Sequence, residues 1–299
     1  MNVLVTGGAG FIGSHTVVEL INSGYDVVIA DNLCNSREEV IDRIEKITHI
    51  RPSFYKIDLL DVPALETVFK ENHIDAVIHF AGLKSGAESI AEPGRYLNSN
   101  LMSSFNLLNM MEKYNVFKLV FSSSATVYGT PEVVPDYETD MVGKVCSPYG
   151  FSKYLIELLL NDFTRQRDNY HFVALRYFNP IGAHPSGIIG EDDGQTSRTI
   201  SFLTSQRRFL VNFHTFVSME TIMTPLTEQA SGIISMWLIW QRGILPHWSI
   251  WIKQQRNMMC LILEPEKALL CFNWCLHSKR FLKRQFLIRL RSLVPVMSP

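Results

Sequence analysis

Short apolar runs alternate with amphipathic stretches through the first two thirds of the chain. Residues 15–22 place apolar side chains at helical spacing, and Ser23-Gly24 closes that helix. This alternation predicts an α/β fold, specifically a Rossmann-type doubly wound parallel sheet with helices on both faces. The runs typical of buried strands are Asn2–Val5, Tyr25–Ala30, Asp75–Phe80, Lys118–Ser122 and His171–Tyr177.

A glycine-rich turn, GGAGFIG at 7–13, follows the first apolar run directly and leads into the first helix. Gly7 permits a tight turn, Gly10 lets the backbone approach a pyrophosphate, and Gly13 lets helix and strand pack closely. Phosphates at the helix N-terminus would meet free N–H groups and the positive end of the dipole. Asp31 ends the next strand, where a carboxylate can accept hydrogen bonds from both ribose hydroxyls and repels a 2′-phosphate. The turn therefore predicts an NAD site, against the simpler interpretation of a plain turn with a capping aspartate.

A second group of polar residues predicts catalysis. Ser122-Ser123-Ser124 ends a strand, and Tyr149 and Lys153 lie four residues apart on one helical face. An ammonium beside a phenol lowers the pKa of the phenol from about 10 towards neutrality, which makes the phenolate a usable general base. We expect Tyr149 to remove a hydroxyl proton while hydride leaves the same carbon for a nicotinamide. The alternative is a solvated surface pair.

Composition divides the chain after residue 193. Residues 1–193 hold 15 Lys and Arg against 25 Asp and Glu, whereas residues 194–299 hold 13 against 4, so the net charges are −10 and +9. All ten tyrosines precede residue 194, and all five tryptophans follow it. We therefore expect an NAD-binding Rossmann domain with the catalytic residues at 1–193, and treat 194–299 separately.

Several classes of protein are not expected. No run approaches the roughly 18 apolar residues of a spanning helix, and the N-terminus lacks the basic region and cleavage site of a signal peptide. The five cysteines form no CxxC pair, so we expect no metal site and a cytoplasmic protein with reduced thiols. The basic tail mixed with Trp, Phe and Leu could indicate a membrane-surface or nucleic-acid segment, but we expect neither partner.

Residues 1–192 resemble the extended short-chain dehydrogenases/reductases, and within them the UDP-glucose 4-epimerase family. The resemblance is nearly unbroken, and its most specific stretches are VTGGAGFIGSH (5–15), DNLCNS (31–36), VIHFAGLK (77–84), FSSSATVYG (121–129), SPYGFSK (147–153) and LRYFNPIGAHPSG (175–187). One departure is Ser99-Asn100, where the family usually has paired asparagines, so a cofactor hydrogen bond near residue 99 is expected to be altered.

The resemblance implies roles for individual residues. Ser124, Tyr149 and Lys153 are implied to be catalytic, with Ser124, Tyr149 and Asn179 facing the UDP-sugar. The implied cofactor-binding residues are Gly7, Gly10, Phe11, Ile12, Gly13, Asp31, Asn32, Asn35, Ser36, Asp58, Leu59, Phe80, Ala81, Gly82, Lys84, Tyr149, Lys153 and Phe178.

The implied reaction interconverts UDP-galactose and UDP-glucose by transient oxidation at sugar C4, with tightly held NAD. A dehydratase would need an additional acid–base pair beside the serine, where this chain has Ala125-Thr126. A related dehydratase and epimerases of other UDP-sugars stay open as alternatives. The resemblance also implies a homodimer.

The resemblance stops just after Asp192, and a displaced reading frame explains residues 194–299. With synonymous codons chosen to favour a match, Met219–Gln229 read one base earlier permits YGNDYDTPDGT, and Ser235–Gln241 likewise permits HVVDLA. Leu261–Leu269 permits FNLGTGKG, and residues 195–203 permit PNIPNNLIP, all similar to the substrate half of the same family. We hypothesise one missing nucleotide near the codon for Asp193. The tail is then an out-of-frame remnant for which we expect low order, and a catalytically impaired NAD-binding polypeptide is the alternative function.

Overall fold

The structure is a computed structural model, and it describes residues 1–129, 143–167, 169–177, 179–181, 183–191, 233–235, 258–263 and 268–271. Most of the segment 194–299, for which low order was expected, lies outside the described residues. Within it the structure describes three short strands.

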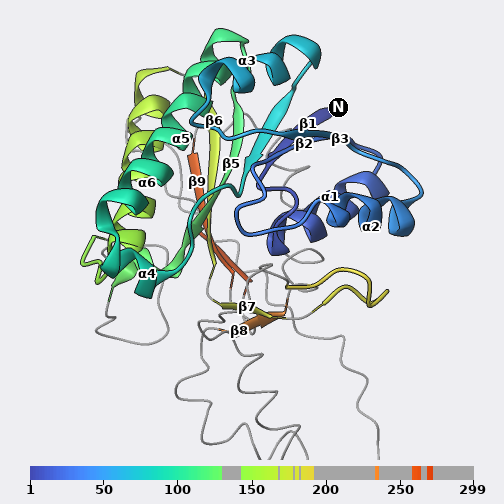
Figure 1. The fold of residues 1–299 in the computed structure, drawn as a ribbon. Coiled ribbons are helices and arrows are strands. Elements are labelled where there is room, and N and C mark those ends of the chain that lie inside the picture. The colour runs from blue at the N-terminus through green and yellow to red at the C-terminus, as the bar shows by residue number, and fades with distance from the viewer. Residues whose placement is uncertain are drawn as a thin grey trace, which may run out of the picture.

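The predicted parallel sheet is present and forms the centre of the fold (Figure 1). Its strands run in the order β10-β9-β6-β5-β4-β1-β2-β3, and all neighbours are parallel except β10, which is antiparallel to β9. A second, two-stranded sheet pairs β7 (Asn179–Ile181) with β8 (Ile233–Ser235). The strands of the large sheet are β1 (Asn2–Thr6), β2 (Asp26–Asp31), β3 (Ser53–Lys56), β4 (Ala76–His79), β5 (Lys118–Ser124), β6 (His171–Tyr177), β9 (Met258–Leu263) and β10 (Ala268–Cys271).

Helices cover both faces of the sheet, as the alternating pattern predicts (Figure 1). One face is covered by α1 (Phe11–Asn22) and α2 (Glu39–Thr48), and the other by α3 (Val62–Glu71), α5 (Pro93–Lys113) and α6 (Pro148–Gln166). Shorter pieces are α4 (Gly86–Ala91) and the 3₁₀ turn η1 (Ala125–Tyr128). In the described part of the chain, none of the helices combines the length and apolarity needed to cross a bilayer.

Alternating strand residues divide the interior into two hydrophobic cores. Val3 and Val5 of β1 pack with α1 and α2, whereas Leu4 between them packs with α3, α5 and α6. All three side chains are fully buried. Burying such a side chain contributes about 1.5–3 kcal/mol to stability. Because successive side chains of a strand point to opposite faces of the sheet, helices are needed on both faces to bury them.

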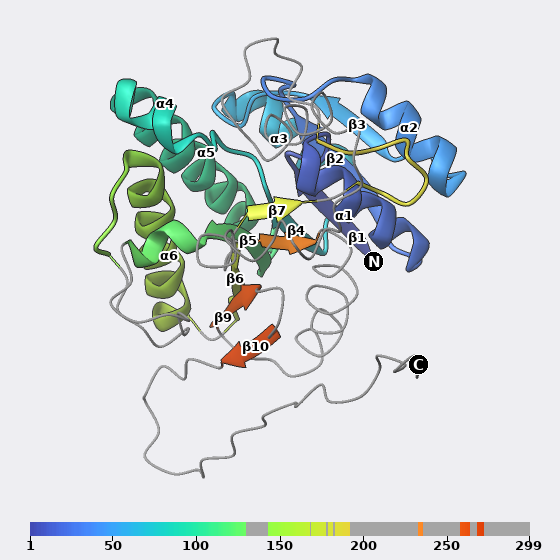
Figure 2. The same ribbon diagram turned by 90° about the horizontal axis from the view of Figure 1, so that it is seen from below.

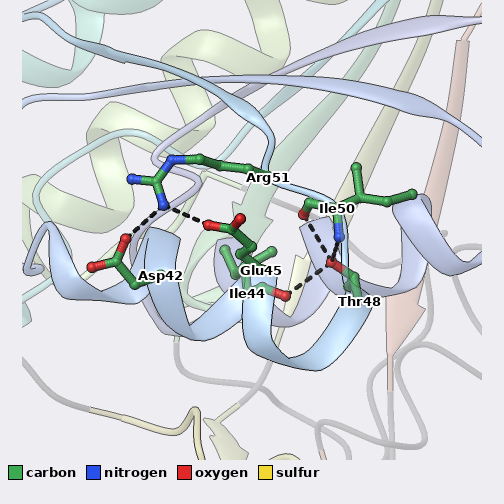
Figure 3. A network of polar contacts seen from close by, with 6 residues as sticks. All are labelled: Asp42, Ile44, Glu45, Thr48, Ile50 and Arg51. Carbon is green, nitrogen blue, oxygen red and sulfur yellow. Dashed lines mark hydrogen bonds and ion pairs between the residues drawn. The ribbon is translucent and has the colours of Figure 1, made fainter.

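The end of α2 is fixed by a local network of polar contacts (Figure 3). Thr48 Oγ1 donates to the Ile44 carbonyl at 2.9 Å and accepts from Ile50 N–H at 3.2 Å. Arg51 Nη1 lies 2.6 Å from both Asp42 and Glu45 carboxylates. These charges are exposed and contribute little stability, and they link Arg51, between α2 and β3, to two carboxylates of α2.

The strand order reverses between β1 and β4, and in open α/β sheets ligands bind beyond the carboxyl ends of the strands at such a point. The glycine turn follows β1, and the segment 80–84 follows β4. Figure 2 shows the molecule from this end, with α1 and α2 on one side of the sheet and α5 and α6 on the other. Topology therefore brings both predicted cofactor segments to one edge.

Candidate functional site

The glycine turn between β1 and α1 is closed by backbone contacts that leave no room for side chains. Gly7 has φ +70°, and a Cβ there would lie 2.6 Å from the Ala81 nitrogen. A Cβ on Gly13 would lie 2.2 Å from the Gly7 carbonyl oxygen. Helix α1 has no side-chain cap and no acidic residue in its first turn. An anion at this terminus would thus meet backbone N–H groups and the helix dipole.

Asp31 ends β2 beside this turn, as predicted. Its carboxylate accepts from Ala9 N–H at 3.0 Å, Leu33 N–H at 2.9 Å and Ser36 Oγ at 3.1 Å. Burial raises the pKa of Asp31, and the Leu33, Ala9 and Ser36 hydrogen bonds oppose that rise. Three donors leave acceptor capacity on the two oxygens for a ribose hydroxyl.

The other residues predicted around the adenosine lie on the loops after β2 and β3. Asn32 Nδ2 donates to Asp58 Oδ2 at 3.0 Å, which joins the two loops. Asn35 is half-buried. Leu59 is buried in the core beneath α3 and α5, and its carbonyl accepts from Asn106 at 3.0 Å. The structure therefore gathers these residues along one edge of the sheet.

The segment after β4, residues 80–84, is the predicted cofactor loop, and it contacts both the end of β1 and Lys153 of α6. The Phe80 and Ala81 N–H groups donate to the Thr6 carbonyl at 2.9 and 3.1 Å. A Cβ on Gly82 would lie 3.2 Å from Asn100 Oδ1 and 3.8 Å from Lys153 Nζ. Gly82 therefore has Lys153, the lysine predicted to be catalytic, as a close neighbour.

Lys84, predicted to lie near the ribose hydroxyls, is exposed and pairs with a distant residue. Its Nζ lies 3.3 Å from Glu191 Oε1, where the two side chains are 55% and 28% exposed. The lysine therefore links the loop after β4 to residues 183–191.

Ser124, Tyr149 and Lys153 come together between β5 and α6. Ser147 caps α6 by accepting from Gly150 N–H at 3.1 Å, which starts the helix just before Tyr149. Tyr149 and Ser124 are hydrogen-bonded to each other. Lys153 Nζ donates to the Ser122 carbonyl at 2.8 Å and lies 5.9 Å from the centroid of the Tyr149 ring.

The electrostatics of the pair differ from the expectation. Burial raises the pKa of Tyr149 above 10, and its hydrogen bond with Ser124 only partly opposes this. Burial lowers the pKa of Lys153 to about 8, although the negative charge of Glu157 raises it. The predicted fall of the Tyr149 pKa towards neutrality is therefore wrong for this chain by itself, because desolvation of the phenolate dominates. A nearby positive charge on a bound group would act in the predicted direction.

The side chains of two predicted site residues are not described by the structure. Phe178 lies outside the described residues. Asn179 begins β7, and the structure describes its backbone alone. Among the residues described, the His, Cys, Asp and Glu side chains form no group of three that could hold a metal ion.

Sequence reasoning missed a buried residue that organises the loop after β4. Asn100 accepts from Leu83 N–H at 2.8 Å and donates to the Leu83 carbonyl at 3.1 Å and to Ser152 Oγ at 3.0 Å. Its neighbour Ser99 marked the departure from the family pattern, which was the available signal. The asparagine that remains thus ties the cofactor loop to α6.

Sequence comparisons with known proteins cover about two thirds of the chain. A profile described as the NAD dependent epimerase/dehydratase family matches residues 3–207. The UDP-glucose 4-epimerase of Bacillus subtilis (strain 168) is 54% identical over 192 residues, covering 64% of this chain and 56% of the relative. That of Yersinia enterocolitica is 50% identical over 205 residues, covering 68% and 61%. The chain therefore spans about three fifths of the length of these curated relatives.

Solved structures are similar over a longer part of the chain. A UDP-glucose 4-epimerase from Bifidobacterium longum, in complex with NAD⁺ and UDP, has a TM-score of 0.75 and 37% identity. One from Stenotrophomonas maltophila, with bound NAD and formylated UDP-arabinopyranose, has a TM-score of 0.75 and 40% identity. Each comparison covers 88% of this chain and 78% of the other. The predicted fold class is confirmed.

Proposed function

Because the chain belongs to the NAD dependent epimerase/dehydratase family, we propose that it carries the NAD site and catalytic residues of a UDP-glucose 4-epimerase. The substrates would be UDP-galactose and UDP-glucose. The observation that carries the proposal is the meeting of Ser124, Tyr149 and Lys153 with Gly82 of the cofactor loop. NAD would be held by the glycine turn, Asp31 and the segment 80–84.

Each catalytic residue has one task in this proposal. NAD, when bound, supplies a reversible hydride acceptor. Tyr149 takes the proton of the sugar 4-hydroxyl, and Ser124 holds the same oxygen through its hydroxyl. Lys153 keeps a positive charge beside the phenol, which favours the phenolate. A general base of this kind contributes about 10²–10⁴-fold to the rate.

The turn after Ser124 favours an epimerase over a dehydratase. Thr126 Oγ1 donates to Ser124 Oγ at 3.0 Å, and Thr126 N–H lies 3.2 Å from the same oxygen. A dehydratase would need an acid and a base beside the serine, but Ala125 and Thr126 cannot exchange protons with substrate at neutral pH. Which UDP-sugar is preferred depends on residues outside this turn.

The frame displacement remains our proposal for residues 194–299. Its support is the composition break at residue 193, together with sequence alignments of 192 and 205 residues, which cover only 64% and 68% of the chain. The substrate half encoded in the restored frame would position the reacting carbon, and that positioning has a large effect on rate. We therefore expect the 299-residue chain to hold NAD and turn over substrate poorly.

One experiment tests both proposals. The coding DNA is sequenced across the codon for Asp193, and the 299-residue chain is assayed beside a chain with one base restored there. We expect both to retain NAD, and UDP-galactose conversion to be at least about 10²-fold faster in the restored chain. No turnover in the restored chain would refute the epimerase proposal. Equal turnover in both would refute the frame proposal.

The proposed assembly is a homodimer through α5 and α6. These helices expose large apolar side chains, namely Met102, Phe105, Phe151 and Leu158, which are 39–46% exposed. Light scattering of the eluted protein gives the mass that decides between monomer and dimer. The cytoplasmic location also stays a proposal, and the exposed Cys34 is in no disulfide.

A further inference from the structure

A buried ion pair that the proposed reaction does not use lies behind the catalytic residues. Glu157 on α6 and Arg176 on β6 are each 5% exposed. Arg176 Nη2 lies 2.7 Å from Glu157 Oε2, and Arg176 Nε donates to Glu157 Oε1 at 3.0 Å. Burying two charges carries a desolvation cost that often cancels their attraction. A role in stability alone therefore does not account for the pair.

The three serines at the end of β5 each meet a different residue of α6. The contacts are Lys153 Nζ to the Ser122 carbonyl at 2.8 Å, Ser123 Oγ to Glu157 Oε1, and Ser124 to Tyr149. The three α6 residues are four positions apart, so they share one face of the helix. Glu157 thus makes one of three contacts that fix the position of α6 relative to β5.

Arg176 extends the same network to the other side of Ser124. It is the register partner of Ser123 on the neighbouring strand. Its Nη1 donates to the Tyr128 hydroxyl at 2.7 Å, and its guanidinium carbon lies 4.8 Å from the centroid of the Tyr128 ring. Tyr128 ends the η1 turn that follows Ser124. The ion pair therefore contacts the chain on both sides of the catalytic serine.

We propose that Glu157 is a positioning residue, whose carboxylate holds Tyr149 and Lys153 of α6 in register with Ser124 of β5. The contacts exist in the chain by itself, and only the consequence for turnover rests on the proposed function. The carboxylate also favours the protonated form of Lys153, against the effect of burial. In the described part of the chain, Lys153 faces Tyr149 and Glu157 of its own helix and His79 of β4, and of these Glu157 raises its pKa.

The titration of Lys153 tests the proposal without any turnover. The full chain is labelled with ¹³C at the lysine ε-carbons, and the Lys153 resonance is assigned with Lys153→Arg. We expect a pKa of about 8 in the unsubstituted chain and a value lower by about one unit or more in Glu157→Gln. Asp162→Asn, which removes an exposed carboxylate from the same helix, should leave the pKa unchanged.

A second variant guards against misfolding. If Glu157→Gln loses its fold because Arg176 is left unpaired, the double variant Glu157→Leu with Arg176→Met removes both charges and keeps an apolar core. We expect the Lys153 pKa to fall there too. A folded variant whose Lys153 titrates as in the unsubstituted chain would overturn the inference.

Turnover gives an independent measurement. In a chain that converts UDP-galactose, Glu157→Gln should lower kcat by tenfold or more with little change in KM, because displaced catalytic groups affect the transition state and not substrate capture. An unchanged kcat would also overturn the inference. Absence of turnover in the restored-frame chain without the substitution, with the Lys153 response intact, would count against the proposed function and leave the positioning role standing.

Discussion

Gly13 shows at the scale of one residue why the glycine turn tolerates no side chain. In Gly13→Ala the new Cβ would meet the Gly7 carbonyl at 2.2 Å and Gly8 Cα at 2.8 Å. Because both are backbone atoms, the turn has to move. We expect a loss of about 1–3 kcal/mol of unfolding free energy and loss of bound NAD, measured by urea unfolding and cofactor content. Gly94→Ala is the control, since nothing lies within 4 Å of its Cβ.

Asn100 makes a second prediction, on the loop after β4. Asn100→Ala leaves the buried Leu83 N–H and carbonyl without their partners. An unsatisfied buried group costs about 1–3 kcal/mol. We expect lower stability and weaker NAD retention, measured by denaturant unfolding and by the NAD dissociation rate. Asn98→Ala, at an exposed position of the same helix, should change neither quantity, and equal effects of the two variants would contradict the prediction.

At this scale the sequence predicts which residues meet but not their energies. The four-residue spacing of Tyr149 and Lys153 requires them to share a helical face, and the structure places them so. The pKa of Tyr149 depends on how far burial outweighs the lysine charge, which no spacing reveals. Glu157 follows the same spacing, yet a lone acid on a helix is usually a solvated one, so its buried partner on β6 could not be foreseen.

At the scale of elements, the apolar runs predict the strands to within one or two residues, and β6 (His171–Tyr177) matches in full. Strand β3 (Ser53–Lys56) was not predicted. Its four residues are exposed or half-buried at the edge of the sheet, so their sequence lacks the continuous apolar run of an inner strand. The position of α6 relative to β5 depends on tertiary contacts and likewise could not be predicted from the sequence.

His79 links β4 to its neighbours and sets a dependence of stability on pH. Its ring bonds Thr6 Oγ1 at 2.7 Å and Ser104 Oγ at 2.9 Å, and burial lowers its pKa from 6.5 to about 3. Between these two values the unfolded chain binds more protons than the folded one. The free energy of unfolding therefore falls as the pH drops from about 6.5 towards 3, by up to about 1.4 kcal/mol per pH unit.

The corresponding variant is His79→Gln, which cannot titrate. It should be less stable than the unsubstituted chain at pH 7, and the difference should shrink as the pH approaches 4. Urea unfolding at several pH values measures it, and His73→Gln, which removes an exposed histidine, provides the control. A stability difference that stays constant with pH would contradict the prediction.

At the scale of the whole molecule, the sequence before residue 193 and the sequence after it differ in how well they agree with the fold. Before it, local pattern, motif and tertiary contacts agree, which is typical of a sequence selected for its fold. After it, the basic tail still supplies Met258–Leu263 as β9, paired in parallel with β6. The run MMCLIL is continuously apolar, as an inner parallel strand requires. It overlaps Leu261–Leu269, which in the shifted frame permits FNLGTGKG.

The pairing of β9 with β6 leads to a prediction about hydrogen exchange. Residues 172–177 lie between β5 and β9, with Phe172 opposite Met258 and Tyr177 opposite Leu263. Backbone N–H groups on both sides of β6 should therefore exchange slowly, and residues 258–263 should be protected with them. Mass spectrometry of peptides from 171–177 and 258–263 measures this. If residues 258–263 exchange as an open chain and half of the β6 amides exchange with them, β9 does not form. The sheet of the 299-residue chain would then end at β6.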